Sequence, residues 1–162
     1  MTIEECQQGL RSPDLETRVA AAEALMLMGP DASPMAVELV QATSDSEEQV
    51  SEFAVAALEE LGPPPTNSLG PLTELLGDPH LPRPYWAAKL IGRMGKDGAS
   101  AEVDLVQLLE SNQEAAAQQE AIRTLQKIGA HSSQCRATLE RATQTQDPRT
   151  ARLATQTLSN MT

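Results

Sequence analysis

Aromatic residues are nearly absent from this sequence, which contains one Phe, one Tyr and one Trp among its 162 residues. A chain of this length can bury a sizeable core, but that core must be built from Ala, Leu, Val, Ile and Met. Most of these residues form helices well, and Ala lets neighbouring helices approach closely. The composition therefore favours an all-α fold with tight helix packing.

Cysteine and long hydrophobic runs are also scarce. Cys6 and Cys135 are the only cysteines, and neither lies in a CxxC or Cys/His spacing. We therefore expect two reduced, helix-packed thiols, with no metal and no cofactor. The sequence has no run of 18 apolar residues, so we expect no membrane association. Its first ten residues are acidic and polar, unlike a signal peptide, which indicates a cytoplasmic protein.

Basic residues are rare in the first half of the chain. Residues 1–81 contain 15 acidic and 2 basic residues, a balance of −13, whereas residues 82–162 contain 8 acidic and 10 basic residues, a balance of +2. The resulting net charge of −11 argues against nucleic acid as a partner, because binding to phosphates needs a basic surface. The uneven distribution is a clue to the partner rather than to the fold.

The sequence does contain an internal repeat. Its skeleton is Ala, three residues, Leu or Ile, three residues, Gly, and the glycines Gly29, Gly62, Gly95 and Gly129 are 33, 33 and 34 residues apart. A fifth copy ends with Thr162 in place of glycine. A fixed period of this size is typical of stacked helical hairpins.

Each repeat is predicted to form two helices. Positions 8, 7, 4 and 1 before the glycine are mostly apolar or small, a spacing that places them on one face of the second helix. The glycine should stop that helix, since glycine adopts the left-handed conformation cheaply. An apolar residue 23 positions before the glycine predicts a shorter first helix. These residues are Cys6, Leu39, Leu72, Val106 and Leu139.

Acidic residues mark the start of the second helices. One repeat position holds Asp14, Glu47, Glu114 and Asp147, where negative charge favours the positive end of a helix dipole. In the third repeat we predict Pro84 in the first turn, where its missing N–H costs little. The run Pro63 to Pro65 should make the joint between the second and third repeats the stiffest in the chain.

The first repeat resembles a known consensus. Asp14 precedes Thr17-Arg18, two residues, Ala21-Ala22, one residue, Ala24-Leu25, three residues and Gly29, and the third repeat keeps an inner glycine as Gly92. This pattern is similar to the short HEAT-like repeats found in the phycobilisome lyase group.

The resemblance implies a right-handed α-α superhelix, or solenoid, whose second helices line the concave side. We therefore expect one HEAT-like domain over residues 1–162. Its five hairpins are predicted at approximately 1–30, 31–65, 66–98, 99–131 and 132–162.

No catalytic constellation is recognisable, and we predict that the protein is not an enzyme. His80 and His131 are expected in exposed loops, and neither precedes a glutamate as the ligands of two-iron HEAT-like enzymes do. The sequence is also too acidic and too poor in aromatics for a HEAT-like DNA glycosylase. An alternative that stays open is an enzyme accessory subunit related to the bilin lyases.

A candidate binding stripe follows from positions 10, 6 and 2 before the glycine, which lie on the polar side of the second helix. Across the stack the stripe changes from acidic through aromatic to basic. We predict that it binds a partner protein or charged peptide in the concave groove, although an ordinary solvated face would also carry such residues. The candidate residues are Glu52, Glu60, Tyr85, Lys89, Arg93, Arg123, Lys127 and Arg152.

Two further alternatives concern the aromatic residues and the assembly. Phe53 and Trp86 share the position nine residues before the glycine, so they either anchor a partner or pack on each other between repeats. We favour a monomeric interaction scaffold over a chain that stacks end to end.

Overall fold

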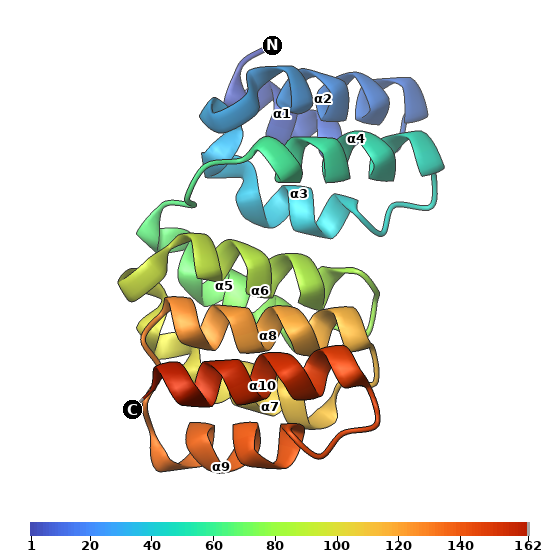
Figure 1. Ribbon diagram of the computed structural model, residues 1–162. Coiled ribbons are helices and arrows are strands. Elements are labelled where there is room, and N and C mark those ends of the chain that lie inside the picture. Colours follow the sequence, from blue (N-terminus) through green and yellow to red (C-terminus); the bar gives the residue numbers. More distant parts are fainter. Residues whose placement is uncertain (162) are drawn as a thin grey trace.

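The computed structural model describes residues 1–161 and shows an α-α superhelix of helical hairpins (Figure 1), which confirms the predicted fold class. The first helices of the hairpins are α1 (Ile3–Leu10), α3 (Ala36–Ala42), α5 (Leu69–Leu75), α7 (Glu102–Ser111) and α9 (Ser133–Ala142). The second helices are α2 (Leu15–Met28), α4 (Glu48–Glu60), α6 (Arg83–Arg93), α8 (Ala115–Lys127) and α10 (Pro148–Asn160). Each predicted repeat range contains one hairpin.

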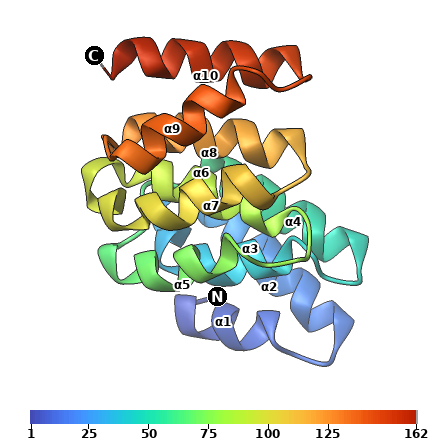
Figure 2. The same ribbon diagram turned by 90° about the horizontal axis from the view of Figure 1, so that it is seen from below.

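The hairpins form two layers. The second helices lie side by side in the front layer of Figure 1, and the first helices lie behind them; Figure 2 shows the same stack from below. Each first helix packs on its own second helix, and α2 packs along α4, α6 along α8, and α8 along α10. The surface of the second helices is therefore continuous across several repeats.

The acidic position at the start of the second helices is the N-cap. The Oδ2 atom of Asp14 accepts a hydrogen bond of 2.9 Å from the Thr17 amide, and Asp147 accepts one of 2.9 Å from the Thr150 amide. Hydrogen bonds from these threonine hydroxyls and amides hold the pKa of both carboxyls below the ordinary value. Glu47 and Glu114 occupy the same N-cap position without a side-chain cap, and Pro84 lies in the first turn of α6 as predicted.

The predicted glycine stop holds for three repeats and is wrong for the second. Gly29, Gly95 and Gly129 have φ values of 55°, 57° and 75°, whereas Gly62 has no positive φ. Helix α4 ends at Glu60, and its C-cap Leu61 is extended with ψ of 133°. Pro63 directly follows Gly62 and favours an extended conformation of that glycine, so Gly62 does not form the left-handed stop.

Short 3₁₀ segments connect several hairpins and were not predicted. They are η1 (Gly29–Met35), η2 (Thr66–Ser68) and η3 (Gly95–Ala101). Such segments lack a hydrophobic period of their own that a sequence pattern could reveal.

Most of the predicted core positions are buried, and Met28 and Val55 are half-buried exceptions. All five residues 23 positions before the repeat end, from Cys6 to Leu139, are at most 1% exposed, as are Ala21 and Leu25 of the first repeat. In the last repeat Thr155 is exposed and Leu158 half-buried, because no further hairpin covers them among the described residues. The stack is thus held together by small and aliphatic side chains.

The stacking is interrupted between the second and third hairpins. Helices α4 and α6 make no more than isolated contacts, and α6 packs against α3 instead. Side-chain hydrogen bonds still cross this joint: the Arg83 guanidinium donates to the Gln41 carbonyl at 3.1 Å, the Ser44 hydroxyl donates to the Leu81 carbonyl at 3.3 Å, and Arg93 of α6 donates to carbonyls at the end of α4. The continuous second-helix layer therefore divides into α2–α4 and α6–α8–α10.

Candidate functional site

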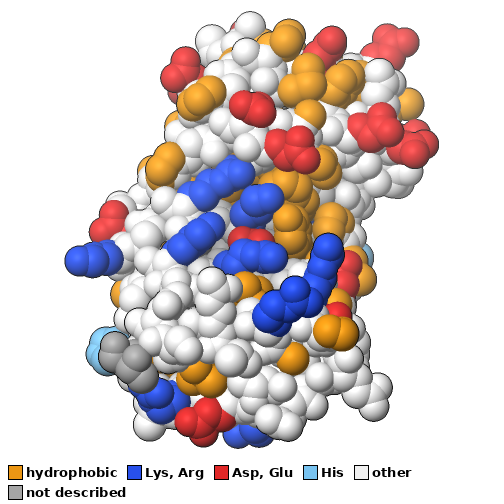
Figure 3. Space-filling model, viewed as in Figure 1, with side chains coloured by type: hydrophobic (Ala, Val, Ile, Leu, Met, Phe, Trp, Pro, Cys, Tyr) orange, Lys and Arg blue, Asp and Glu red, His pale blue; other side chains and the backbone are white. Residues whose placement is uncertain are grey.

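The predicted stripe lies on the outer surface of α4, α6, α8 and α10, which we call the second-helix face. Figure 3 shows basic side chains gathered over the middle of this face and acidic ones toward the N-terminal hairpins. Glu52 and Glu60 are exposed on α4, and Tyr85, Lys89 and Arg93 are half-buried on α6. The remaining candidates are exposed: Arg123 and Lys127 on α8 and Arg152 on α10.

Arg93 is occupied inside the protein. Its Nη1 atom donates to the carbonyls of Leu58 at 2.6 Å and Leu61 at 2.7 Å, and its Nη2 atom donates to that of Glu59 at 3.2 Å. These carbonyls lie at the C-terminal end of α4, where the last turn of a helix has no internal donors. Arg93 therefore caps α4 across the joint, and its bonds to the backbone leave it less available to a partner than the sequence implied.

Lys89 is likewise held by its neighbours. Its Nζ atom lies 3.2 Å from the Tyr85 hydroxyl and 5.0 Å from the centre of the Trp86 ring. The two rings meet edge to face, 5.3 Å apart at 80°. This arrangement leaves Tyr85 half-buried at the surface, beside an ammonium group that its π face attracts.

The alternative in which Phe53 and Trp86 pack on each other is not what the structure shows. Trp86 is 5% exposed and belongs to the core, while Phe53 is half-buried. Within residues 1–161 the ring contact of Trp86 is with Tyr85. The open joint between α4 and α6 explains this, because the two helices that carry Phe53 and Trp86 do not stack closely.

An acidic group that the predicted stripe did not include lies beneath the basic side chains. Glu120 is only 4% exposed, and its Oε2 atom lies 3.3 Å from Nη1 of Arg123. Burial lowers the pKa of the Arg93 guanidinium, and the Glu120 carboxylate opposes part of that shift. The sequence did contain one indication of this group. Glu120 occupies the repeat position that holds Phe53 and Trp86 in the two preceding repeats, so a charged residue there departs from the aromatic pattern.

A shallow hollow of about 350 Å³ opens between α8 and α10. Arg123, Arg149 and Arg152 surround it, together with Leu153 and two glutamines, Gln119 and Gln156. Arg149 was not among the predicted stripe residues, although it lies one turn before Arg152 and so shares its face. With Lys89, Arg93 and Lys127, these three arginines form what we call the basic cluster.

A second hollow of about 270 Å³ lies on α4. Val55 and Ala56 form its apolar part, and Glu52 and Glu59 lie at its edge. Figure 3 shows hydrophobic side chains between the basic cluster and the acidic residues. The face therefore changes from basic to apolar to acidic, whereas the sequence stripe predicted an aromatic centre at Tyr85 between the two charges.

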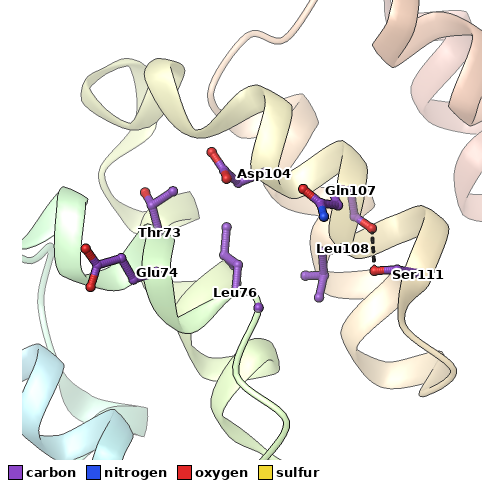
Figure 4. A pocket seen from close by; sticks show the side chains of 8 residues that line it. Thr73, Glu74, Leu76, Asp104, Gln107, Leu108 and Ser111 are labelled. Atoms are coloured by element: carbon purple, nitrogen blue, oxygen red, sulfur yellow. Dashed lines mark hydrogen bonds between the residues drawn. The ribbon is translucent and has the colours of Figure 1, made fainter.

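The opposite layer carries a smaller pocket of about 160 Å³ between α5 and α7 (Figure 4). Glu74 and Asp104 lie at its rim, and the Ser111 hydroxyl donates to the Gln107 carbonyl of the same helix at 2.7 Å. Both groups of that hydrogen bond belong to α7, so the bond is part of the helix. Within residues 1–161, no group of three His, Cys, Asp or Glu side chains could hold a metal ion.

The remaining reactive side chains lie away from the second-helix face. Cys6 and Cys135 are free and buried, and burial raises the pKa of both thiols, that of Cys135 to about 11. His80 and His131 are exposed outside the helices. Low reactivity is expected of a protonated buried thiol.

In the described part of the chain, no helix combines the length and apolarity that a membrane crossing requires.

The fold defines a helical repeat protein, and comparison with solved structures agrees. The CpcE–CpcF complex of phycocyanin lyase from Nostoc sp. PCC7120 matches 100% of this chain with a TM-score of 0.68 and 20% identity. A designed armadillo repeat protein in complex with the peptide (KR)4 matches 99% with a TM-score of 0.62 and 16% identity. An engineered protein matches 98% with a TM-score of 0.63 and 21% identity.

These similarities describe the fold. The chain spans 65% of the matched lyase chain, 47% of the engineered protein and 88% of the designed armadillo protein. The sequence matches no protein-family profile and no characterised relative.

Proposed function

We propose that this chain is a non-catalytic interaction scaffold that binds a segment of a partner protein through the concave, second-helix face. The observation that carries the proposal is the basic cluster, which lies on the continuous face of α6, α8 and α10, next to the apolar hollow on α4. Interface energies depend on aromatic and arginine side chains, and this face offers both. Two of the similar folds support the idea in general, since one was solved with a peptide and the other as a two-subunit complex.

The test uses a photo-crosslinking amino acid placed on either layer. Gln156 lies in the hollow on α10, and Gln107 is exposed on α7 of the opposite layer. In a lysate of the source cells, we expect a crosslinked partner from position 156 and none from position 107. Crosslinking from position 107 alone, equal crosslinking from both positions, or none from either would contradict the proposal.

A charge-reversed variant sharpens the test. Lys127→Glu, Arg149→Glu and Arg152→Glu together should abolish the crosslink from position 156 while the helical circular dichroism spectrum stays unchanged. These three side chains are exposed, so the variant avoids the cap made by Arg93 and the ion pair of Arg123. Retention of the crosslink would move the binding site away from the basic cluster.

The second candidate is an accessory subunit of a lyase-like enzyme, which the similarity in fold to CpcE–CpcF favours. This candidate is tested by an absorbance measurement that does not depend on crosslinking. Tetrapyrrole absorbance in the purified protein, or after mixing with a bilin, would support this candidate over the scaffold.

A further inference from the structure

Most basic side chains of α8 and α10 are exposed and have no acidic partner in the described part of the chain. Arg18, Arg83 and Arg141 each pair with an acidic residue of the same chain. In residues 1–161, Lys127, Arg149 and Arg152 form no such ion pair, and the side chain of Arg123 remains 46% exposed despite its contact with Glu120. The charge of this region is therefore free to meet an external acid.

The arrangement of these residues suits carboxylates. Arg149 and Arg152 are three residues apart on α10, and Arg123 and Lys127 are four apart on α8, so each pair lies on one side of its helix. Three of the four line the same hollow, with Leu153 beside them. A guanidinium group binds a carboxylate through two parallel hydrogen bonds, which makes such a site geometrically selective.

The spacing of the helices sets the spacing of the ligand. Packed helices lie about 8–10 Å apart. A peptide in the extended polyproline II conformation advances about 3.1 Å per residue with three residues per turn, so about three residues reach from one helix to the next and every third side chain faces the protein. A peptide that crosses the stack would place residue i over α10, residue i+3 over α8 and residue i+6 over α6.

The third contact has a different character. Over α6 a ligand meets the half-buried Tyr85 and Lys89, whose ammonium group is already held by Tyr85 and Trp86. Beyond it lies the apolar hollow of Val55 and Ala56 on α4. An apolar residue fits this position better than a third acid.

We propose that the second-helix face binds an extended acidic peptide of a partner protein with the pattern acidic–x–x–acidic–x–x–apolar. The proposal rests on the proposed function and specifies the chemistry of its ligand. Glu52 and Glu59 edge the hollow on α4 beyond the apolar position, so an acid placed further along the peptide is repelled. The same acids and the net charge of −11 disfavour a long polyanion such as nucleic acid.

Fluorescence anisotropy with purified protein and labelled synthetic peptides tests this pattern. The probe contains Glu-Gly-Ser-Glu-Gly-Ser-Leu, made in both chain directions because the pattern does not set the direction. A control peptide has the same composition with the two glutamates adjacent. We expect at least one spaced peptide to bind about fivefold more tightly than the control, and its affinity to fall as salt screens the charges.

Matched variants connect the affinity to the named residues. Arg149→Glu with Arg152→Glu should weaken binding by at least about tenfold, which corresponds to about 1.4 kcal/mol. Arg149→Lys with Arg152→Lys keeps the charge but loses the two parallel hydrogen bonds of each guanidinium, so its affinity should lie between those of the wild type and the charge-reversed variant. Lys96→Glu alters an exposed lysine of η3 and should leave the affinity unchanged.

Three results would overturn the proposal: equal affinity for the spaced and control peptides, tighter binding of a lysine-substituted peptide, or tighter binding of a single-stranded oligonucleotide. If neither spaced peptide binds more tightly than the control while position 156 still crosslinks a partner, only the acidic pattern is contradicted. If the crosslink is absent as well, the proposed function is also contradicted.

Discussion

Arg93 shows how one side chain can replace a missing cap. Helix α4 lacks the left-handed glycine that ends three of its counterparts, and the Arg93 guanidinium reaches three carbonyls at its last turn instead. Hydrogen bonds from a charged donor contribute more to stability than neutral ones. In addition, a carbonyl left without a donor would have lost its solvent without a replacement. The residue therefore contributes to stability before it contributes to binding.

Replacing Arg93 by alanine should lower the free energy of unfolding by about 1–3 kcal/mol, since the carbonyls of α4 lose their donors. Urea denaturation followed by circular dichroism measures this change. Lys127→Ala removes an exposed cation of the same face and should change the stability by at most about 0.5 kcal/mol. Equal effects of the two substitutions would show that Arg93 does not act as a cap.

At the scale of the elements, the close approach of α6 and α8 depends on a small residue. A side chain at Gly92 would place its Cβ 2.9 Å from Oγ1 of Thr124. That hydroxyl is buried and donates to the Ala88 carbonyl of α6 at 2.7 Å. The inner glycine of the third repeat is thus explained by the packing of two helices and a hydrogen bond between them.

Gly92→Ala should destabilise the protein by about 1–3 kcal/mol, because the buried threonine must move. Gly77→Ala provides the control, since the atom nearest its added Cβ is the Glu74 carbonyl oxygen at 3.8 Å, an ordinary van der Waals distance. Alanine there should change the stability by at most about 0.5 kcal/mol. Thermal unfolding of both variants measures the difference, and a stabilising Gly92→Ala would refute the packing argument.

At the scale of the whole molecule, the joint between α4 and α6 separates two hairpins from three. The N-terminal part also carries most of the negative charge, and like charges repel one another in the compact state. Stability in a stacked array depends on contacts between neighbouring repeats. We therefore expect the coupling across this joint to be weaker than elsewhere in the stack.

Native-state hydrogen exchange should show residues 1–60 opening as one unit at lower urea concentration than residues 83–160. Arg93→Ala should widen the interval between the two openings, because it removes a link across the joint. The Gly92→Ala variant, which acts inside the C-terminal part, should narrow the interval. Opening of the whole chain in one step, with no effect of Arg93, would contradict the weak joint.

The sequence by itself determined the hairpins, most of the helix starts and the buried positions. These depend on apolar residues at steps of three and four and on caps such as Asp14 and Asp147, all of which act within a few residues of the chain. It also predicted the change from acidic to basic along the second-helix face in outline.

Only the tertiary structure decided which of these charges remain free. The bond from Arg93 to the Leu58 carbonyl spans 35 residues, and the hollow near Arg149 needs α8 and α10 in place. The separation of Phe53 from Trp86 and the burial of Glu120 depend in the same way on how one repeat lies against the next. A repeat pattern describes each hairpin alone, whereas contacts between hairpins depend on their relative placement, which the local pattern does not encode.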